Sequence, residues 1–504
     1  MKKQLLFIVL SIIFISVSAQ QKSLNEITSF KIKNSGSFID KNKDVDGYYF
    51  YYEVDKLKKG KREYAIKMLD NNLNEIATKS YIDDKNTILA QSKFNNQKLM
   101  FAMLNTKERM FKLVTFDKSG NQGEDIKIEV SKKESKWLNF MMKNGDFNLL
   151  FPVDDKGFLF NYLRNNKKMG YGLKYVSTDG GTSWDYNSPE DSKEWLSINP
   201  IEANDKVVVL LEGSKKSMLS QTINMKAVVL DINTGKKLFE KTYDRENNPR
   251  LVTNAFLTKE NNVVILGEYF DEGENFMKAD SKGLFAQVVD MSGNVVSDQK
   301  VSWENKIDKM MPADSDGKKR KNTYVYFHDI IRTQTGSYYC IGEKYRKTIS
   351  AMGMLSGNNV TQLTITDAVV FEFDQNFELK NIKQIEKGKS RAPNLTDFGS
   401  PQLNAHALVS YGAFDYEFTQ IDQDRDRFYS TFIDYERLKG EKNKLAFKAV
   451  MYSDGELSED KIYLEQSKGR VKFRVLPAKL GHVMIFEFNK KEKTLDIHLE
   501  KLNL

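Results

Sequence analysis

Short apolar segments recur along the chain, and two of them, residues 48–52 and 207–211, are apolar at successive positions rather than at alternate ones. A strand with this pattern needs cover on both faces of its sheet, because successive side chains point to opposite faces. The 3.6-residue period of an amphipathic helix is rare between the segments, so helices are not expected to provide that cover. Eight such segments occur, at residues 48–52, 98–104, 147–151, 207–211, 263–267, 338–342, 428–432 and 483–488.

A second strand and a tight turn follow the apolar segment in most of these units. Residues 64–70 and 111–117 are strands of this kind, and each ends at an aspartate. The strand that ends at Asp231 runs into a turn that contains Gly235. Aspartate and glycine suit tight turns because both tolerate a left-handed backbone. The repeating unit is therefore a strand, a polar loop, a second strand, a tight turn and a third strand.

Short antiparallel sheets stacked around an axis cover one another, because each sheet lies between its two neighbours. Eight units over residues 20–504 give about 60 residues per unit, above the common propeller repeats of about 40 to 50, and long loops account for the difference. We predict an all-β chain that forms a single β-propeller of eight blades, with seven blades as the alternative. Two consecutive all-β domains are a further alternative, but no Pro- or Gly-rich linker divides the chain.

The two ends of the chain suggest how the ring closes. The last unit ends with the strand 494–500 and has no outermost strand. Residues 27–32 form a predicted strand that belongs to no unit. Pairing this N-terminal strand with the last unit would complete the eighth blade and remove an exposed edge. Residues 132–143 are the best helical candidate, with an innermost strand as the alternative.

The first 19 residues have the features of a signal peptide. Lys2 and Lys3 precede an apolar stretch, residues 5–17, and Val17-Ser18-Ala19 offers a small-residue cleavage site. No later apolar run approaches the roughly 20 residues of a membrane span. We therefore expect a signal peptide at 1–19, a propeller domain at 20–504, and a periplasmic or secreted protein with no transmembrane segment after signal removal.

Charge and cysteine content narrow the function classes. The formal net charge is +8, from 77 basic and 69 acidic side chains, which is far from the footprint of a nucleic-acid-binding protein. The dense basic run 318–321 is interpreted as a solvated loop, with contact to an acidic partner as the alternative. Cys340 is the only cysteine, so no intramolecular disulfide forms. Stability must then come from a large apolar core.

The sharpest motif is Ser-Thr-Asp-Gly-Gly-Thr-Ser-Trp at residues 177–184. It resembles the Asp-box of sialidase-like propellers at all five defining positions. The resemblance implies a turn between the third and fourth strands of a blade, away from the ligand face, and a structural role. In such a turn the aspartate binds local backbone amides and the tryptophan packs into the blade. The defining positions are Ser177, Asp179, Gly181, Ser183 and Trp184.

Sialidase activity does not follow from this resemblance. Those enzymes add an arginine triad, a tyrosine nucleophile and an acidic partner. Their Phe-Arg-Ile-Pro element precedes the first Asp-box, whereas the similar segment here, 473–477, lies near the other end and carries an extra residue. The sequence has one clear Asp-box, where such enzymes usually have several. The chain therefore resembles exported β-propellers of unknown function that share an Asp-box with the sialidase-like group.

Metal and cofactor motifs are weak. Residues 42–53 match the spacing of a calcium loop, with Asn42 in place of the usual first aspartate. A plain hairpin turn is the favoured interpretation, because residues 48–52 are a predicted strand and Glu53 need not return to the ion. The four histidines are far apart in sequence, and none shows metal-ligand spacing. We predict no metal and no cofactor.

Long segments are predicted to gather on one face, because loops between second and third strands share a face with loops between blades. Loops on a rigid scaffold often carry function. The long segments are 154–170, 270–283, 304–322, 345–366 and 386–404. Candidate binding residues on this face are Tyr162, Arg164, Tyr269, Tyr345, Met352 and Met354. A hairpin lid over the central channel is the alternative for the two methionines.

Two function classes remain. The favoured one is a non-catalytic binding or assembly propeller of the cell envelope, whose partner is an envelope protein or a saccharide. The alternative is a saccharide-directed glycoside hydrolase of sialidase-like architecture, whose catalytic residues no local motif marks. An arginine cluster with a tyrosine and an acid at the channel mouth would favour the hydrolase. A broad apolar or aromatic patch on the long-loop face would favour binding.

Overall fold

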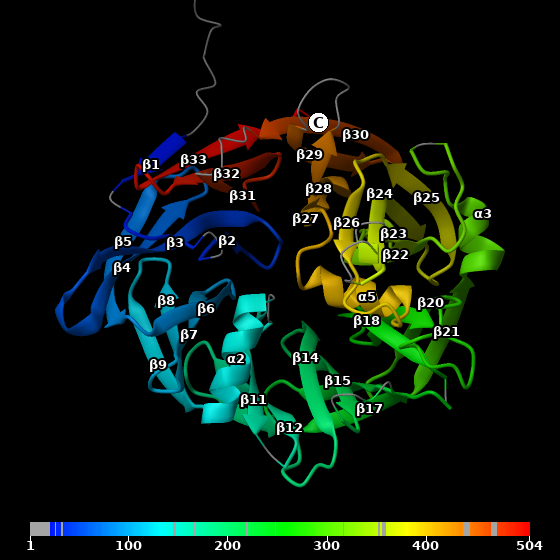
Figure 1. The fold of residues 1–504 in the computed structure, drawn as a ribbon, viewed down its shortest axis with the longest axis horizontal. Helices are drawn as coiled ribbons and strands as arrows, with labels where there is room; N and C mark the ends of the chain where they lie inside the picture. Colours follow the sequence, from blue (N-terminus) through cyan, green and yellow to red (C-terminus); the bar gives the residue numbers. More distant parts are fainter. Residues whose placement is uncertain are drawn as a thin grey trace, which may run out of the picture.

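Eight antiparallel sheets surround a central axis in the computed structural model (Figure 1). The structure describes residues 21–503 apart from 26, 32–33, 145–147, 166, 218–219, 221, 247, 316, 351–352, 355–358, 437–443 and 465–470. The chain is therefore an all-β propeller, and eight blades are confirmed over the seven-blade alternative. The signal peptide predicted at 1–19 lies outside the described residues.

The strands fall into four concentric positions, from the central channel outward. The innermost strands are β2 (Ser35–Ile39), β6 (Thr87–Phe94), β10 (Leu150–Val153), β14 (Trp195–Ala203), β18 (Arg250–Leu257), β22 (Tyr324–Arg332), β27 (Tyr416–Asp422) and β31 (Val471–Pro477). The second strands are β3 (Val45–Lys56), β7 (Lys98–Asn105), β11 (Gly157–Asn165), β15 (Val207–Lys215), β19 (Val263–Tyr269), β23 (Tyr338–Ile349), β28 (Arg427–Glu436) and β32 (His482–Asn489).

Third and outermost strands complete each blade. The third strands are β4 (Lys61–Asp70), β8 (Met110–Asp117), β12 (Met169–Ser177), β16 (Asn224–Asp231), β20 (Gly283–Val289), β24 (Thr361–Phe373), β29 (Lys444–Ser453) and β33 (Thr494–Lys501). The outermost strands are β5 (Glu75–Asp84), β9 (Gln122–Glu129), β13 (Ser183–Asn187), β17 (Lys237–Tyr243), β21 (Val295–Ser302), β25 (Leu379–Ile385), β30 (Glu456–Leu464) and β1 (Gln21–Leu24). An extra strand, β26 (Ser390–Pro393), pairs with β24.

The eight recurring apolar segments are the second strands of their blades in all cases but one. These strands lie between neighbouring blades, so both of their faces are covered; Phe50 and Phe101 are completely buried. The exception is the segment 147–151, which overlaps the innermost strand β10. In that blade β11 takes the second position, and its buried run Phe158, Leu159 and Phe160 is equally apolar.

An N-terminal strand closes the ring, as predicted, but it lies further upstream than residues 27–32. Strand β1 pairs antiparallel with β33, with Leu24 opposite Leu495. Within the predicted segment, Ile27 and Phe30 are buried between the first and eighth blades instead. Phe30 contacts the rings of Phe486 and Phe488, so this segment serves as packing and not as a strand.

Helices cap one end of the propeller. Helix α2 (Lys132–Asn144) confirms the predicted helix, and Ser131 with Glu134 forms a capping box at its start. Helix α5 (Pro401–Val409) buries Ala405 and Leu408 against the sixth blade. The shorter helical segments are Lys58–Gly60, Trp303–Ile307, α3 (Asp308–Met310) and Gln423–Arg425. No helix among the described residues is long and apolar enough to cross a membrane.

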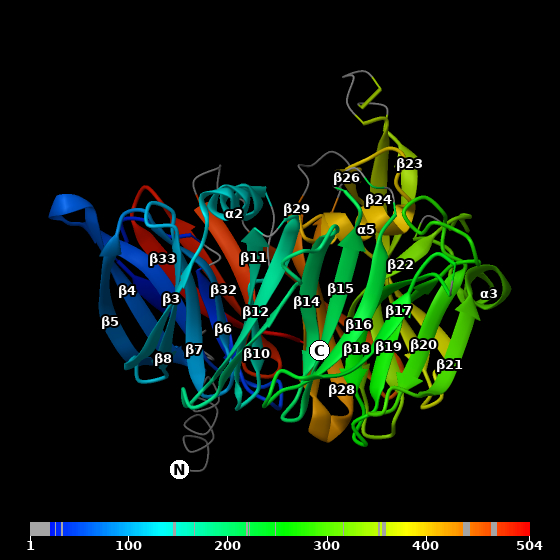
Figure 2. The same ribbon diagram turned by 90° about the horizontal axis from the view of Figure 1, so that it is seen from below.

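The end that carries α2, α5, β26 and the β23–β24 hairpin is called the long-loop face (Figure 2). The predicted long segments 270–283, 304–322 and 386–404 contain real connections between strands. The segment 154–170 is not a long loop, because β11 occupies most of it. The residues of β11 pair with β12, so this segment is part of the blade, and the prediction of a long loop there was wrong.

Candidate functional site on the long-loop face

The β23–β24 hairpin extends beyond the body of the sixth blade (Figure 2). Its two strands are 12 and 13 residues long, and they pair out to Ile349 opposite Thr361. Strand β26 adds a third strand to this extension, with Gln362 opposite Pro393. The extension is therefore a small sheet of three strands, which is stiffer than an isolated hairpin.

Large apolar side chains are exposed on this extension. Phe398 is 86% exposed, Ile349 71% and Met354 56%. Ile349 and Phe398 both line a hollow of about 320 Å³. Contiguous exposed apolar side chains of this size mark interaction sites in soluble proteins. The set is called the hairpin surface and comprises Ile349, Met354, Val360, Leu395 and Phe398.

Hydrogen bonds hold the two segments of the hairpin surface together. The Asp397 carboxylate accepts the backbone N–H groups of Val360 at 3.0 Å and Thr361 at 2.8 Å, and the Thr361 hydroxyl at 2.6 Å. The bond from the Thr361 hydroxyl is the main cause of a lowered pKa at Asp397. Lys347 Nζ donates to the backbone carbonyls of Asp397 and Gly399. The loop that carries Phe398 is therefore fixed against the hairpin.

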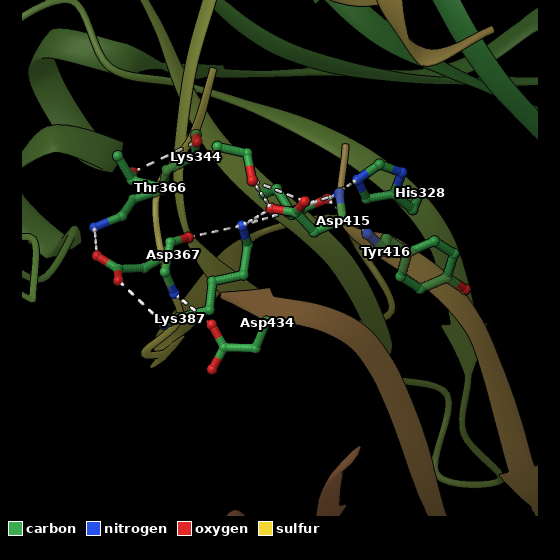
Figure 3. Close-up of polar contacts among 11 residues, drawn as sticks. His328, Lys344, Thr366, Asp367, Lys387, Asp415, Tyr416 and Asp434 are labelled. Atoms are coloured by element: carbon green, nitrogen blue, oxygen red, sulfur yellow. Dashed lines mark hydrogen bonds and ion pairs between the residues drawn. The ribbon is translucent and has the colours of Figure 1, made fainter. Parts of the chain in front are cut away.

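A buried ion network lies at the base of the hairpin (Figure 3). Lys387 Nζ lies 2.9 Å from Glu343 Oε1 and 2.5 Å from Asp415 Oδ2. The three side chains are at most 8% exposed. Burial alone would raise the pKa of Glu343, but Lys387 and then His328 hold it well below its usual range. Burial lowers the pKa of Lys387, and the two carboxylates more than offset this and raise it.

The network ties the sixth blade to the seventh. Glu343 of β23 accepts the backbone N–H groups of Asp415 and Tyr416, at the start of β27. The Gly388 N–H donates to Asp434 of β28 at 2.6 Å (Figure 3). Buried carboxylates therefore accept the hydrogen bonds of these backbone N–H groups. A buried backbone group that is left unpaired would cost free energy. The orientation of the hairpin base is fixed by these contacts.

A second buried lysine extends the network along β23. Lys344 Nζ lies 2.8 Å from Asp314 Oδ1 and 3.3 Å from Asp367 Oδ2. Arg320 and Arg346 also contact Asp314, at 2.6 and 3.1 Å. Burial opposes ionisation of Asp314, but the bond from Lys344 and its two arginine neighbours lower its pKa. The charges are therefore compensated within the chain.

His328 and Tyr416 border the network on its channel side. The His328 ring stacks on Tyr416 at 4.6 Å between ring centres, and its Nε2 lies 2.9 Å from Glu343 Oε2. Tyr416 donates to Thr419 at 2.9 Å. The side chains of His328 and Glu343 are only 6% and 0% exposed, so a substrate does not reach this pair in the structure. The contacts support a structural role for the network.

The predicted binding residues do not form one site. Met354 belongs to the hairpin surface, and Met352 lies outside the described residues. Tyr162 lines a cavity of about 360 Å³ between α2 and α5. Arg164 pairs with Glu190 at 3.2 Å. Tyr269 lies in the fifth blade, beneath Lys300.

Tyr345 was predicted to be a binding residue of the long-loop face, but the structure buries it. Its side chain is 1% exposed and packs against Tyr324 and Phe414. It belongs to the core because β23 is covered on both faces at this position. The prediction missed Ile349 and Phe398, which carry the most exposed area of the hairpin surface. The sequence signal for Phe398 was its position as a single phenylalanine in a segment of turn-forming residues, between Asp397 and Gly399.

The Asp-box-like turn lies between β12 and β13, on the end opposite the long-loop face. Asp179 Oδ1 accepts the Ser177 hydroxyl at 2.6 Å and the Gly181 N–H at 3.0 Å. Trp184 is 9% exposed, stacks on Tyr175 and donates its indole N–H to the Ile232 carbonyl at 2.7 Å. These contacts agree with a structural role, which stays a prediction.

The candidate calcium loop has the geometry of a turn. Asp40 Oδ1 accepts the backbone N–H groups of Asn42 and Asp44, at 2.8 and 3.0 Å. Glu53, the proposed closing ligand, is buried and pairs with Arg62 instead. The described residues contain no group of three or more His, Cys, Asp or Glu side chains placed to hold a metal ion.

The fold and these contacts define a β-propeller that carries helices and a three-stranded extension on its long-loop face. The chain belongs to the family described as "Family of unknown function (DUF6770)", whose match spans residues 1–503. A search of the curated proteins finds no match to the chain.

Solved structures with a similar fold are propeller proteins of low sequence identity. Prolyl oligopeptidase B from Galerina marginata aligns with a TM-score of 0.42 and 10% identity, over 94% of this chain and 55% of that one. This chain therefore spans about half the length of that enzyme. The β-propeller domain of the Trilobed protease from Pyrococcus furiosus gives 0.38 and 10%, over 84% and 97%. The polysaccharide lyase Uly1 gives 0.39 and 10%, over 82% and 89%.

Proposed function

We propose that this protein is a non-catalytic binding or assembly propeller of the cell envelope, and that it holds a partner protein on the hairpin surface. The observation that carries the proposal is the exposure of Phe398 and Ile349 beside a common hollow. Leaving such side chains in water forgoes about 1.5 to 3 kcal/mol each, which burial against a partner would recover. The proposal places the working surface on the predicted long-loop face.

Preorganisation supports a role in binding. Asp397 and Lys347 fix the loop that carries Phe398, and the buried network around Lys387 fixes the base of the hairpin. A surface that is already ordered loses little conformational entropy when it binds. Aromatic anchors with few rotatable bonds are also typical of residues that dominate binding energy.

The charges around the hollow indicate the chemistry of the partner. Lys278 and Lys347 line the hollow with one acidic side chain, Asp280. Two exposed lysines of the basic run 318–321, Lys319 and Lys321, are close in sequence to Asn322, which lines the same hollow. A partner with an apolar centre and an acidic rim would match this arrangement. A saccharide offers less apolar area, so an envelope protein is the favoured occupant.

The hydrolase alternative has no comparable support. It requires an arginine cluster beside a tyrosine and an acid at the channel mouth. Among the described residues that line the cavity in the central channel, Arg474 is the one arginine. The nearby buried network is compensated internally and sealed from solvent.

Site-specific photo-crosslinking in cells of the source organism tests the proposal. A photoreactive benzoylphenylalanine replaces Phe398 in one variant and Val296 in the control. Val296 is a matched control because it is 61% exposed and lies on the outermost strand β21. We expect a protein partner to crosslink from position 398 and not from position 296.

The purified pair then gives a quantitative test. Phe398→Asp and Ile349→Asp should each weaken binding by roughly tenfold or more, since about 1.4 kcal/mol of lost burial corresponds to a factor of ten. Val296→Asp should leave the dissociation constant unchanged. Equal affinity for Phe398→Asp and the control, or the same crosslinked products at both positions, would disprove the proposed surface.

A further inference from the structure

A cavity of about 650 Å³ lies in the central channel. It follows the innermost strands of four consecutive blades, β31, β2, β6 and β10. Its volume falls within the range of about 300 to 1,000 Å³ that is typical of small-molecule sites. The hairpin surface does not contribute to it, so its role is separate from the proposed function.

Lys93 of β6 lines this cavity without a counter-ion. Its ammonium group makes no hydrogen bond or ion pair with any residue that the structure describes. Burial is the main cause of a lowered pKa at Lys93, and the positive charge of Arg474 lowers it further. The Lys93 side chain is half-buried, so its ammonium group is accessible to a ligand in the cavity.

Arg474 of β31 lines the same cavity near Lys93. Its Nη1 donates to the Ser35 carbonyl at 3.1 Å, which anchors the guanidinium on the cavity wall. The acidic lining residues Asp40 and Asp154 lie at the turns after the innermost strands. Asp40 accepts backbone N–H groups of its own turn. Lys93 and Arg474 are therefore two basic side chains that line the same cavity, and Glu417 is an acidic neighbour of Arg474.

We infer that the central channel binds a small molecule through an oxyanion group, a carboxylate, sulfate or phosphate, held between Lys93 and Arg474. The planar guanidinium suits paired contacts to two oxygens of such a group, and the ammonium adds a point charge. An anion would relieve the repulsion between the two cations.

The rest of the lining indicates the body of the ligand. The hydroxyls of Tyr49 and Ser92 lie 2.7 Å apart and line the same cavity as Lys93. Phe94 and Leu476 provide apolar surface beside them. A polar ring or short chain that carries one acidic group fits this mixture of contacts.

Isothermal titration calorimetry of the mature protein tests the inference with three probes: glucuronate, sulfate and inorganic phosphate. The buffer contains chloride as its only other anion. Binding of glucuronate alone would assign a carboxylate ligand, and binding of sulfate or phosphate would assign a tetrahedral anion. A dissociation constant above about 10 mM for all three probes would overturn the inference.

Lys93→Met and Lys127→Met form a matched pair of variants. Lys127 is exposed on β9, the outermost strand of the same blade. Lys93→Met should weaken binding by about ten- to a hundredfold, which is the loss of one charge-assisted contact. Lys127→Met should bind as the wild type does.

The stability of the same variants separates a ligand site from a structural lysine. Lys93→Met should leave the melting temperature without ligand unchanged or raise it, because it removes a half-buried positive charge that Arg474 repels. A lower melting temperature, or unchanged anion affinity in Lys93→Met, would contradict the inference. Arg474→Lys keeps the charge but not the planar fork, and it should weaken glucuronate binding while the protein stays folded.

Discussion

Replacing Lys387 with methionine tests how much burial adds to the energy of an ion pair. Lys387 and Lys380 each contact two carboxylates. Lys387 lies 2.9 Å from Glu343 and 2.5 Å from Asp415, and Lys380 lies 2.8 Å from both Asp374 and Glu378. The Lys387 side chain is completely buried, whereas that of Lys380 is 48% exposed. The two lysines differ in burial and hardly in geometry.

The expected losses of stability are very different. Lys387→Met leaves Glu343 and Asp415 buried without their cation, and breaking a buried pair in this way costs about 3 to 5 kcal/mol. Lys380→Met exposes its carboxylates to water, which replaces the lost contacts, so only a small change is expected. Methionine keeps the length of the aliphatic chain, so packing changes little in either variant.

Urea denaturation of the protein, followed by tryptophan fluorescence and circular dichroism, measures both variants. The cost of Lys387→Met should shrink as the pH falls. Lys387 is the main group that lowers the pKa of Glu343; without it, burial raises that pKa, and the carboxyl is protonated at higher pH. Equal destabilisation by the two substitutions, or a cost independent of pH, would refute the reasoning.

Three further predictions concern the scaffold. Trp184→Phe loses the indole bond to Ile232 and should cost about 1 to 3 kcal/mol in urea denaturation without changing the affinity of either proposed site. A truncated chain that begins after residue 25 lacks β1 and should melt at a lower temperature than a chain that begins at residue 20, and it should self-associate through β33, as light scattering would show. Burial raises the pKa of Glu268 to about 8, so wild-type stability should fall as pH rises from about 4.5 to about 8. Glu268→Gln should remove this fall in melting temperature, and an unchanged pH profile in the variant would contradict it.

The blades were predictable because their pattern is local. Residues such as 207–211 are apolar at every position, and only a strand covered on both faces tolerates this sequence. The closing strand was harder to place. Gln21–Leu24 pairs with β33 although its composition is polar, while the more apolar Ile27 and Phe30 pack into the core. Backbone pairing at an outer edge needs no apolar side chains, so the sequence carries little signal for it.

The two candidate sites could not be predicted from the sequence, for a different reason. Lys93 and Arg474 come from the second and eighth blades, and only the closure of the ring brings them to one cavity. Ile349 and Phe398 likewise meet because β26 pairs back onto β24. No spacing along the sequence encodes such contacts. The segment 345–366 was nevertheless predicted to belong to the functional face, because loops between second and third strands share a face with loops between blades.

The buried ion network under the hairpin surface is better explained by its effect on the orientation of the hairpin than by its contribution to the free energy of unfolding. Taking several charges out of water is costly, and apolar replacements of similar volume are often equally stable. Glu343 and Asp434, however, bind backbone N–H groups at the start of β27 and in the connection after β25. Apolar side chains do not provide those directional contacts. The network therefore holds the hairpin at one angle to the seventh blade, and a weaker partner affinity of Lys387→Met, measured where the variant is still folded, follows from the same argument.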